Sequence, residues 1–125
     1  MAGDEELESL TGRYLGDGAA ADPNKRAALR QRWQADLADE HGRVRLFRRR
    51  GCEHCEGHGY LGRLGIHELM LADDQIRKHI RHREDAGVLQ AAALAAGMKT
   101  LRQDGIDKVL AGLTDLSEVI AATGD

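Results

Sequence analysis

A complete helix signal lies near the C-terminus, in residues 100–112, which read TLRQDGIDKVLAG. Thr100 is a residue type that caps helix N-termini, because its side-chain oxygen accepts a hydrogen bond from a backbone N–H group of the first turn. Gly112 is a residue type that ends helices. Between them, apolar residues recur at helical spacing, namely Leu101, Ile106, Val109 and Leu110. We therefore predict a helix that begins at Thr100 and ends at Gly112.

The same signals predict further helices before and after this one. The expected first residues are Asp22 followed by Pro23, Asp73 or Asp74, Asp85, and Thr114 or Asp115. The helix after Pro23 should run to about Glu40, and the helix after Asp85 should end at Gly97. The apolar stripes are Leu7, Leu10 and Tyr14, then Leu29, Trp33 and Leu37, then Ile76 and Ile80. Because only four residues are aromatic, aliphatic side chains must fill most of the core, which favours helices.

Two short runs predict strands instead of helices. In residues 44–47, Val44 and Leu46 alternate with Arg45 and Phe47. Residues 61–70 form a second run, which contains Gly62 and Gly65. We expect the two runs to pair across the turn that separates them. The predicted fold class is therefore α+β, with a helical N-terminal segment, a small two-stranded ribbon bearing a Cys-x-x-Cys knuckle, and a C-terminal group of short helices.

Both cysteines of the chain lie in that turn, within residues 51–60, which read GCEHCEGHGY. A Cys-x-x-Cys turn points backbone N–H groups at the sulfurs and favours the thiolate, the form that binds metals. We predict Cys52 and Cys55 as ligands of a metal, with zinc as the candidate. A closed zinc site has four ligands, and the candidates for the other positions are His54, His58 and His67. The alternatives are a reduced, empty pair of thiols and a disulfide.

Composition limits the classes of protein to which the chain can belong. Its 125 residues suffice for one domain, or for one small domain with a subdomain. Lysine and arginine total 18 against 21 acidic residues, a net charge of −3, which argues against a general nucleic-acid binder. The longest uncharged run, residues 86–98, is too short to span a bilayer, and the acidic N-terminus is unlike a secretory signal. We expect a soluble cytoplasmic protein.

Basic residues gather in two places along the chain. They are Arg43, Arg45, Arg48, Arg49 and Arg50, and then Arg77, Lys78, Arg81 and Arg83. A neighbouring subunit, a lipid surface or a nucleic acid would suit them, but we favour the plainer interpretation of a solvated strand edge and helix face. Arg63 and Glu68 stand five residues apart, on opposite faces of a strand, so we do not expect them to pair with each other.

Two blocks of sequence carry a resemblance to a known family. Residues 59–69, GYLGRLGIHEL, resemble the run that follows the second cysteine pair in the ATPases of type II secretion and type IV pilus assembly, the GspE/PilB type. Residues 97–109, GMKTLRQDGIDKV, resemble the C-terminal segment of the same family, and residues 112–119 continue the match. Together the blocks cover about Phe47 to Ala122, in the family's order and at similar spacing.

The resemblance implies a C-terminal piece of a hexameric motor that hydrolyses ATP to power protein secretion or pilus extension. Members of the family have a four-cysteine zinc site, and Cys52 and Cys55 match its second pair. Residues 1–71 would form the second half of this metal-binding subdomain with a helical connection, and residues 72–125 a C-terminal helical subdomain. The implied partners are the rest of the ATPase chain, neighbouring subunits of the hexamer and inner-membrane components of the secretion or pilus platform, without nucleic acid. The implied location is the cytoplasm, peripheral to the bacterial inner membrane through those partners.

The chain departs from the family in two functional elements. The first Cys-x-x-Cys pair is absent, so only half of the zinc site is present. No Gly-x-x-x-x-Gly-Lys-[Ser/Thr] loop occurs, and without its backbone amides and lysine to hold phosphates this chain should not hydrolyse ATP. ATP and magnesium would belong to the parent protein alone. We therefore expect no catalytic residue here, and a structural role in packing and subunit contacts.

Two other functions remain open from the residues alone. The first is a free-standing zinc-knuckle interaction module, chaperone-like or nucleic-acid binding, because the spacing Cys-x-x-Cys-x-Gly-x-Gly also resembles the knuckle that DnaJ-type chaperones repeat four times. The second is a thiol oxidoreductase, although its motif normally opens a helix after a strand in a βαβ unit, which this sequence does not supply.

Overall fold

The computed structural model describes residues 3–46, 51–57, 59–60 and 62–124. Regular structure in this part of the chain is helical. The elements are α1 (Asp4–Leu15), the short 3-10 helix η1 (Gly18–Ala21), α2 (Pro23–Leu37), α3 (Asp74–Arg81), α4 (Ala86–Ala95), α5 (Leu101–Leu110) and α6 (Leu116–Thr123). No helix in these residues is both long enough and apolar enough to cross a lipid bilayer.

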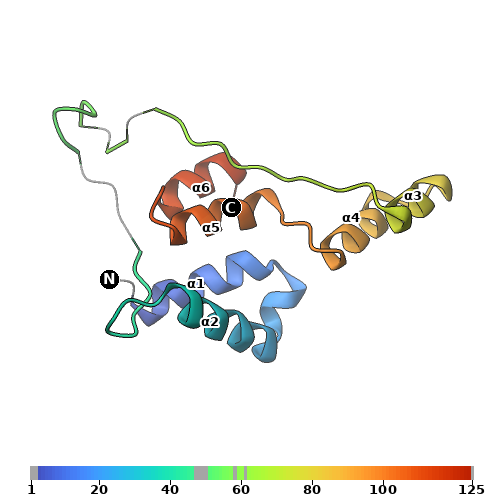
Figure 1. Ribbon diagram of the computed structural model, residues 1–125, viewed down its shortest axis with the longest axis horizontal. Helices are drawn as coiled ribbons and strands as arrows, with labels where there is room; N and C mark the ends of the chain where they lie inside the picture. The colour runs from blue at the N-terminus through green and yellow to red at the C-terminus, as the bar shows by residue number, and fades with distance from the viewer. Residues whose placement is uncertain (1–2, 47–50, 58, 61, 125) are drawn as a thin grey trace.

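The helices form three pairs with different surroundings (Figure 1). The α1–α2 pair, connected through η1, lies beside the α5–α6 pair, and α1 contacts α5 directly. The α3–α4 pair projects away from this body (Figure 1). Residues 62–73 form a long extended segment that passes the α5–α6 pair on its way to α3 (Figure 1). The body therefore consists of two helical pairs, with one extended segment laid along it.

The core of the body is a cluster of side chains from α1, α2 and α5, together with Val44 after α2. Its buried members are Leu7, Leu10, Tyr14, Leu29, Trp33, Val44, Ile106 and Leu110. The rings of Tyr14 and Trp33 meet edge to face with their centroids 5.5 Å apart, an arrangement that aromatic pairs favour. Most residues that recur at helical spacing in the sequence are buried, as predicted, but Leu37 and Ile80 are exposed, at 38% and 52%.

Side-chain caps begin five of the six α-helices at the predicted residues. The carboxylates of Asp22, Asp73, Asp85 and Asp115 each accept a hydrogen bond from a backbone N–H in the first turn that follows, and the Thr100 hydroxyl does the same for α5. Gln103 bonds back to the Thr100 N–H at 3.0 Å, which completes a capping box. The end of α2 differs from the prediction, because the chain leaves the helix at Ala38 instead of near Glu40. The helices α4 and α5 each end two residues before the predicted glycine, at Ala95 and Leu110.

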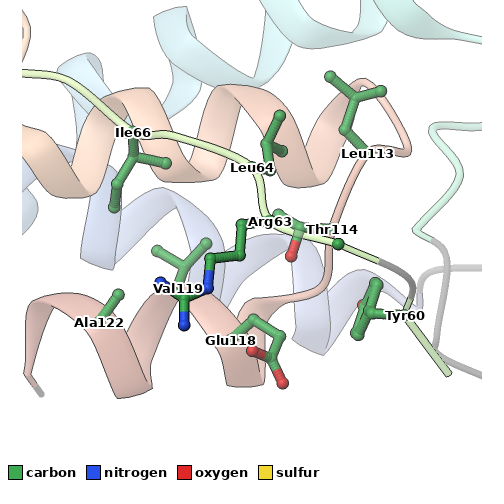
Figure 2. Close-up of a pocket in the computed structure, with 10 residues that line it drawn as sticks. Tyr60, Arg63, Leu64, Ile66, Leu113, Thr114, Glu118, Val119 and Ala122 are labelled. Atoms are coloured by element: carbon green, nitrogen blue, oxygen red, sulfur yellow. The ribbon is translucent and has the colours of Figure 1, made fainter. Parts of the chain in front are cut away.

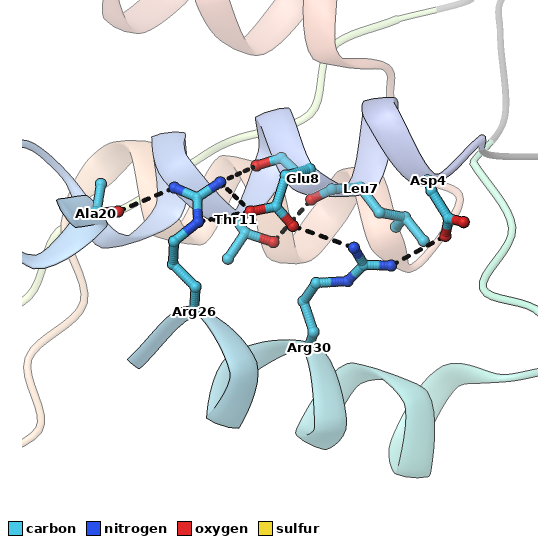
Figure 3. A network of polar contacts seen from close by, with 7 residues as sticks. All are labelled: Asp4, Leu7, Glu8, Thr11, Ala20, Arg26 and Arg30. Atoms are coloured by element: carbon cyan, nitrogen blue, oxygen red, sulfur yellow. Dashed lines mark hydrogen bonds and ion pairs between the residues drawn. The ribbon is translucent and has the colours of Figure 1, made fainter. Parts of the chain in front are cut away.

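Arginines of α2 hold α1 in place through a polar network (Figure 3). The Arg26 guanidinium donates to the Glu8 carboxylate at 2.6 Å and to the backbone carbonyls of Glu8 and Ala20, both at 3.0 Å. Arg30 donates to Glu8 at 3.1 Å and to Asp4 at 3.2 Å. These contacts join arginines of α2 to carboxylates and a backbone carbonyl of α1 and to a carbonyl of η1, and they therefore fix how the α1–α2 pair closes.

The predicted two-stranded ribbon is wrong, and so is the α+β fold class. In the described residues the only strand-like pairing is an isolated antiparallel bridge between Ala38 and Val44, and Phe47 lies outside them. Residues 62–70 make no backbone–backbone hydrogen bond within that part of the chain. The reason is that side chains of α5 bind this segment instead: Asp104 accepts from the His67 N–H at 2.8 Å, and Lys108 donates to the Gly65 carbonyl at 2.7 Å.

A glycine allows α5 and α6 to approach closely. A methyl group added to Gly105 would lie 2.6 Å from a Val119 methyl carbon, closer than carbon atoms in proteins pack. Both residues are buried. The α5–α6 contact therefore requires a residue without a side chain at this position.

We predict that Gly105→Ala destabilises the protein by up to about 2 kcal/mol, because an overpacking cost of about 1–3 kcal/mol outweighs the roughly 1 kcal/mol that alanine adds to helix propensity. Urea unfolding followed by circular dichroism measures this difference. Gly18→Ala is the matched control, because nothing lies within 4 Å of its added methyl group. A stabilised Gly105→Ala variant would contradict the packing described here.

Acid should weaken the α1–α2 pair through Glu8. Hydrogen bonds from Arg26 and Arg30 hold the pKa of Glu8 below its ordinary value of 4.5. A carboxylate with a lowered pKa in the folded state stabilises the protein above its unfolded pKa, and this contribution disappears as pH falls through the folded pKa. The Tm gap between the native protein and Glu8→Gln should therefore be widest near pH 7 and should close as pH falls below 4.5 and through the lowered pKa of folded Glu8. Glu5→Gln on the same helix should show no such gap, and a gap independent of pH would refute the role of Glu8.

Candidate functional site

The two cysteines sit in a tight turn built from backbone hydrogen bonds. The Gly57 N–H donates to the Cys52 carbonyl at 3.0 Å and closes the turn. The N–H groups of Cys52 and Gly59 both donate to the Cys55 sulfur at 3.2 Å. The two Sγ atoms lie 3.3 Å apart, with Cys55 buried and Cys52 exposed. The turn therefore gathers both sulfurs and aims N–H donors at one of them, as the sequence predicted.

Glycine is required where the two ends of this turn, at Gly51 and Gly57, approach each other closely. A methyl group added to Gly51 would lie 2.7 Å from the Gly57 carbonyl oxygen, a distance that no side-chain carbon tolerates. Gly57 itself has φ +80°, in the left-handed region that glycine adopts without steric cost. The glycines around the cysteines thus have a direct steric purpose, since they let the backbone close around the sulfurs.

The surroundings of Cys55 favour its thiolate form. The hydrogen bond from the Cys52 thiol, followed by those from the backbone N–H groups of Cys52, Gly59 and Gly57, lowers the pKa of Cys55 to about 7. A thiol with such a pKa is substantially ionised at neutral pH, and the thiolate is the form that binds metal ions and attacks electrophiles.

The cysteine pair fits half of a zinc site. Two sulfurs on one tetrahedral zinc, with Zn–S bonds of about 2.3 Å, are about 3.8 Å apart, so a small side-chain rotation from 3.3 Å would let both bind one ion. Within the described residues no cluster of three or more His, Cys, Asp or Glu side chains could hold a metal. His54 is exposed, and His67 belongs to the segment bound by α5. His58 lies outside the residues that the structure describes.

A groove of about 470 Å³ lies between the start of the extended segment and α6 (Figure 2). Apolar side chains line much of it, namely Leu64, Ile66, Leu113, Val119 and Ala122. Tyr60, Arg63, Thr114 and Glu118 add polar groups. Burial, together with its hydrogen bond to Asp115, raises the pKa of Tyr60, so that side chain stays neutral at physiological pH. No local pattern in the sequence indicates this groove, because its walls come from segments far apart in the chain.

Arg63 lies in this groove without a charged partner. No hydrogen bond or ion pair of its guanidinium occurs in the described part of the chain, and Figure 2 shows the side chain extending over Val119. Glu68, five residues away, accepts a hydrogen bond from the Leu101 N–H at 2.8 Å. The strand on which we placed Arg63 and Glu68 does not form, and no bond between these two side chains occurs in the described residues.

The basic clusters are partly neutralised by acidic neighbours. Arg45 bonds Asp39 at 2.9 Å, and Arg77 approaches Asp74 at 3.6 Å. Residues 48–50 of the first cluster lie outside the described residues. Lys78 and Arg81 are exposed on α3.

Comparison with known proteins identifies similar sequences in bacterial secretion machinery. The family model described as type II/IV secretion system protein matches residues 21–121. The type IV pilus assembly ATPase PilB of Thermus thermophilus is 49% identical over 80 residues, which cover 64% of this chain and 9% of PilB. The type II secretion system protein E of Pectobacterium carotovorum is 51% identical over 73 residues, 58% of this chain and 14% of its own length. The type II secretion system ATPase E of Vibrio cholerae is 42% identical over 78 residues, 62% of this chain and 15% of its own length.

The structure of the cysteine turn leads to a prediction about thiol reactivity. Gly51→Ala should open the turn, remove N–H donors from the Cys55 sulfur and raise its pKa above about 7. The rate of iodoacetamide alkylation at Cys55 would be measured as a function of pH in a Cys52→Ser background. Its pH profile should shift to higher pH when Gly51→Ala is added to that background. His54→Ala, an exposed change in the same turn, should leave the profile unmoved. If Gly51→Ala and His54→Ala gave the same dependence of alkylation rate on pH, the close approach of Gly51 to Gly57 would not be what positions the N–H donors at the Cys55 sulfur.

Proposed function

The chain belongs to the type II/IV secretion system protein family, and from this premise we propose that it is a structural, non-catalytic part of an ATPase that powers protein secretion or pilus extension. One observation carries the proposal: the family match spans residues 21–121, while the sequence contains no phosphate-binding loop. The matched regions cover between 9% and 16% of the relatives' lengths. Their ATPase activity therefore requires residues that this sequence does not contain.

Exposed apolar side chains support a role in packing against other protein. Leu69 and Leu71 of the extended segment are 72% and 75% exposed, and Leu113 between α5 and α6 is 57% exposed. Leu69 and Leu71 line one groove together with Ala93 and Met98, and Leu113 lines another. Exposed apolar patches are typical of surfaces that contact another domain or subunit. We assign these two surfaces to contacts within the ATPase and between subunits of a hexamer. The membership of this chain in the secretion family also favours a packing role within an ATPase over a free-standing zinc-knuckle module.

We further propose that Cys52 and Cys55 supply two of the four ligands of a structural zinc site. The donor set, the separation of the two sulfurs and the N–H groups aimed at Cys55 all suit this role. Zinc, when bound, would cross-link this turn to the residues that supply the other two ligands. The ion would have no part in the ATPase chemistry, because a closed site leaves no position for substrate.

The proposed location follows from the proposed machine. The assembly would stand in the cytoplasm and meet inner-membrane components of the secretion or pilus platform through protein contacts. The exposed basic residues of α3, among them Lys78 and Arg81, would serve a subunit interface.

A chimaera tests the proposed function. In the T. thermophilus PilB, the 80 matched residues would be replaced by the corresponding residues of this chain. We expect the chimaera to assemble and to hydrolyse ATP at a rate within about tenfold of the parent, because remote structural contacts position the catalytic groups without taking part in the reaction. The isolated 125-residue chain should show no ATP hydrolysis.

A matched variant of the chimaera tests the zinc proposal. With Cys52→Ser and Cys55→Ser, the chimaera should lose one zinc per subunit, measured by atomic absorption, and unfold at lower temperature. A chimaera that is folded but inactive would reject the proposed function, and equal zinc contents would reject the ligand assignment.

A further inference from the structure

Among the residues that the structure describes, the backbone of the extended segment, residues 62–70, is bound along one edge only. Its contacts with α5 use the Gly65 carbonyl and the His67 N–H group. Along an extended chain, the N–H and C=O groups of successive residues point to opposite edges. Gly65 and His67 stand two residues apart, and their groups accordingly both face α5.

The other edge is free to bind a partner's backbone. By the same alternation, the N–H and C=O groups of Leu64, Ile66 and Glu68 face away from α5. None of them makes a backbone–backbone hydrogen bond within the described ranges of the chain. Leu64 is 48% exposed and Glu68 is also exposed, so this edge is accessible. A row of unpaired backbone groups on an extended segment is the template to which another strand adds.

The groove beside this edge indicates the chemistry of the partner. Leu64, Ile66 and Val119 would contact aliphatic side chains, and the unpaired guanidinium of Arg63 would attract a carboxylate (Figure 2). A helix could fill the groove, but its backbone groups are bonded internally and could not pair with the edge. An extended strand can satisfy both features at once.

We propose that residues 62–70 receive an extended peptide strand from a partner, which carries a carboxylate for Arg63 and aliphatic side chains for the groove. The pairing is with a partner, not with another part of this chain, and so differs from the ribbon that the structure contradicts. The inference rests on the proposed function in that it places the strand donor within the secretion ATPase assembly.

Amide hydrogen exchange measured by NMR on the full 125-residue chain tests the proposal. In the free chain, the His67 amide should exchange slowly, while the amides of Leu64, Ile66 and Glu68 exchange rapidly. A capped peptide of alternating valine and glutamate should slow these three amides by about tenfold at saturation, with little change at His67. The proposal would be overturned if these amides showed no protection at the highest soluble concentration of the peptide. Chemical-shift changes in the groove without protection of these amides would also overturn it.

Matched variants separate backbone pairing from side-chain contact. Ile66→Pro removes one outward N–H group and should abolish the protection, while Ile66→Val keeps that group and should retain it. Circular dichroism of both variants verifies that the helices remain. Arg63→Glu should weaken binding of the valine–glutamate peptide by about fivefold and favour a valine–lysine peptide instead. Equal affinities for the two peptides would overturn the assignment of a carboxylate.

The peptide experiment and the chimaera can fail independently. An active chimaera without peptide protection would keep the proposed function and reject strand addition. Peptide protection with an inactive chimaera would support strand addition and reject the proposed ATPase role.

Discussion

The packing of α5 is the constraint on which the rest of this molecule depends. One side of the helix presents Ile106 and Leu110 to the core shared with α1 and α2. Another carries Gly105, whose missing side chain admits Val119 of α6. Gln103 also donates to the Tyr14 carbonyl at 2.9 Å, which joins the N-terminal end of α5 to the end of α1. Each neighbour of α5 is therefore held by a different set of its residues.

The polar residues of the same helix decide the conformation of the extended segment. Asp104 and Lys108 bond each other at 2.7 Å and also bond backbone groups of that segment. The Lys108 ammonium, and then the His67 N–H, hold the pKa of Asp104 below its ordinary range, so the carboxylate stays ionised at neutral pH. Side chains of a helix thereby satisfy backbone groups that a neighbouring strand would satisfy in a sheet. A segment bound in this way keeps one edge free, which a true ribbon would have paired.

Two features with separate chemistry result from this arrangement. The cysteine turn is local, because its hydrogen bonds and close contacts all lie within residues 51–59. The groove is not local, because it forms where the extended segment passes α6. In the proposed role, a metal ion bound by the cysteines would order the turn, and the apolar groove with Arg63 would select a neighbouring protein.

The sequence by itself determined what depends on near neighbours in the chain. The caps at Asp22, Asp73, Asp85, Thr100 and Asp115, the apolar stripes, the approach of Cys52 to Cys55 and the family resemblance could all be read from residues a few positions apart. The tertiary structure alone decided two things about the described residues: residues 62–70 have no strand partner among them, and Arg63 lies in a groove with no bonded partner among them. A short run such as residues 61–70 favours an extended backbone, but its own residues do not specify what binds that backbone. That choice belongs to Asp104 and Lys108, which lie about forty residues further along the chain and reach the segment only after α5 has packed.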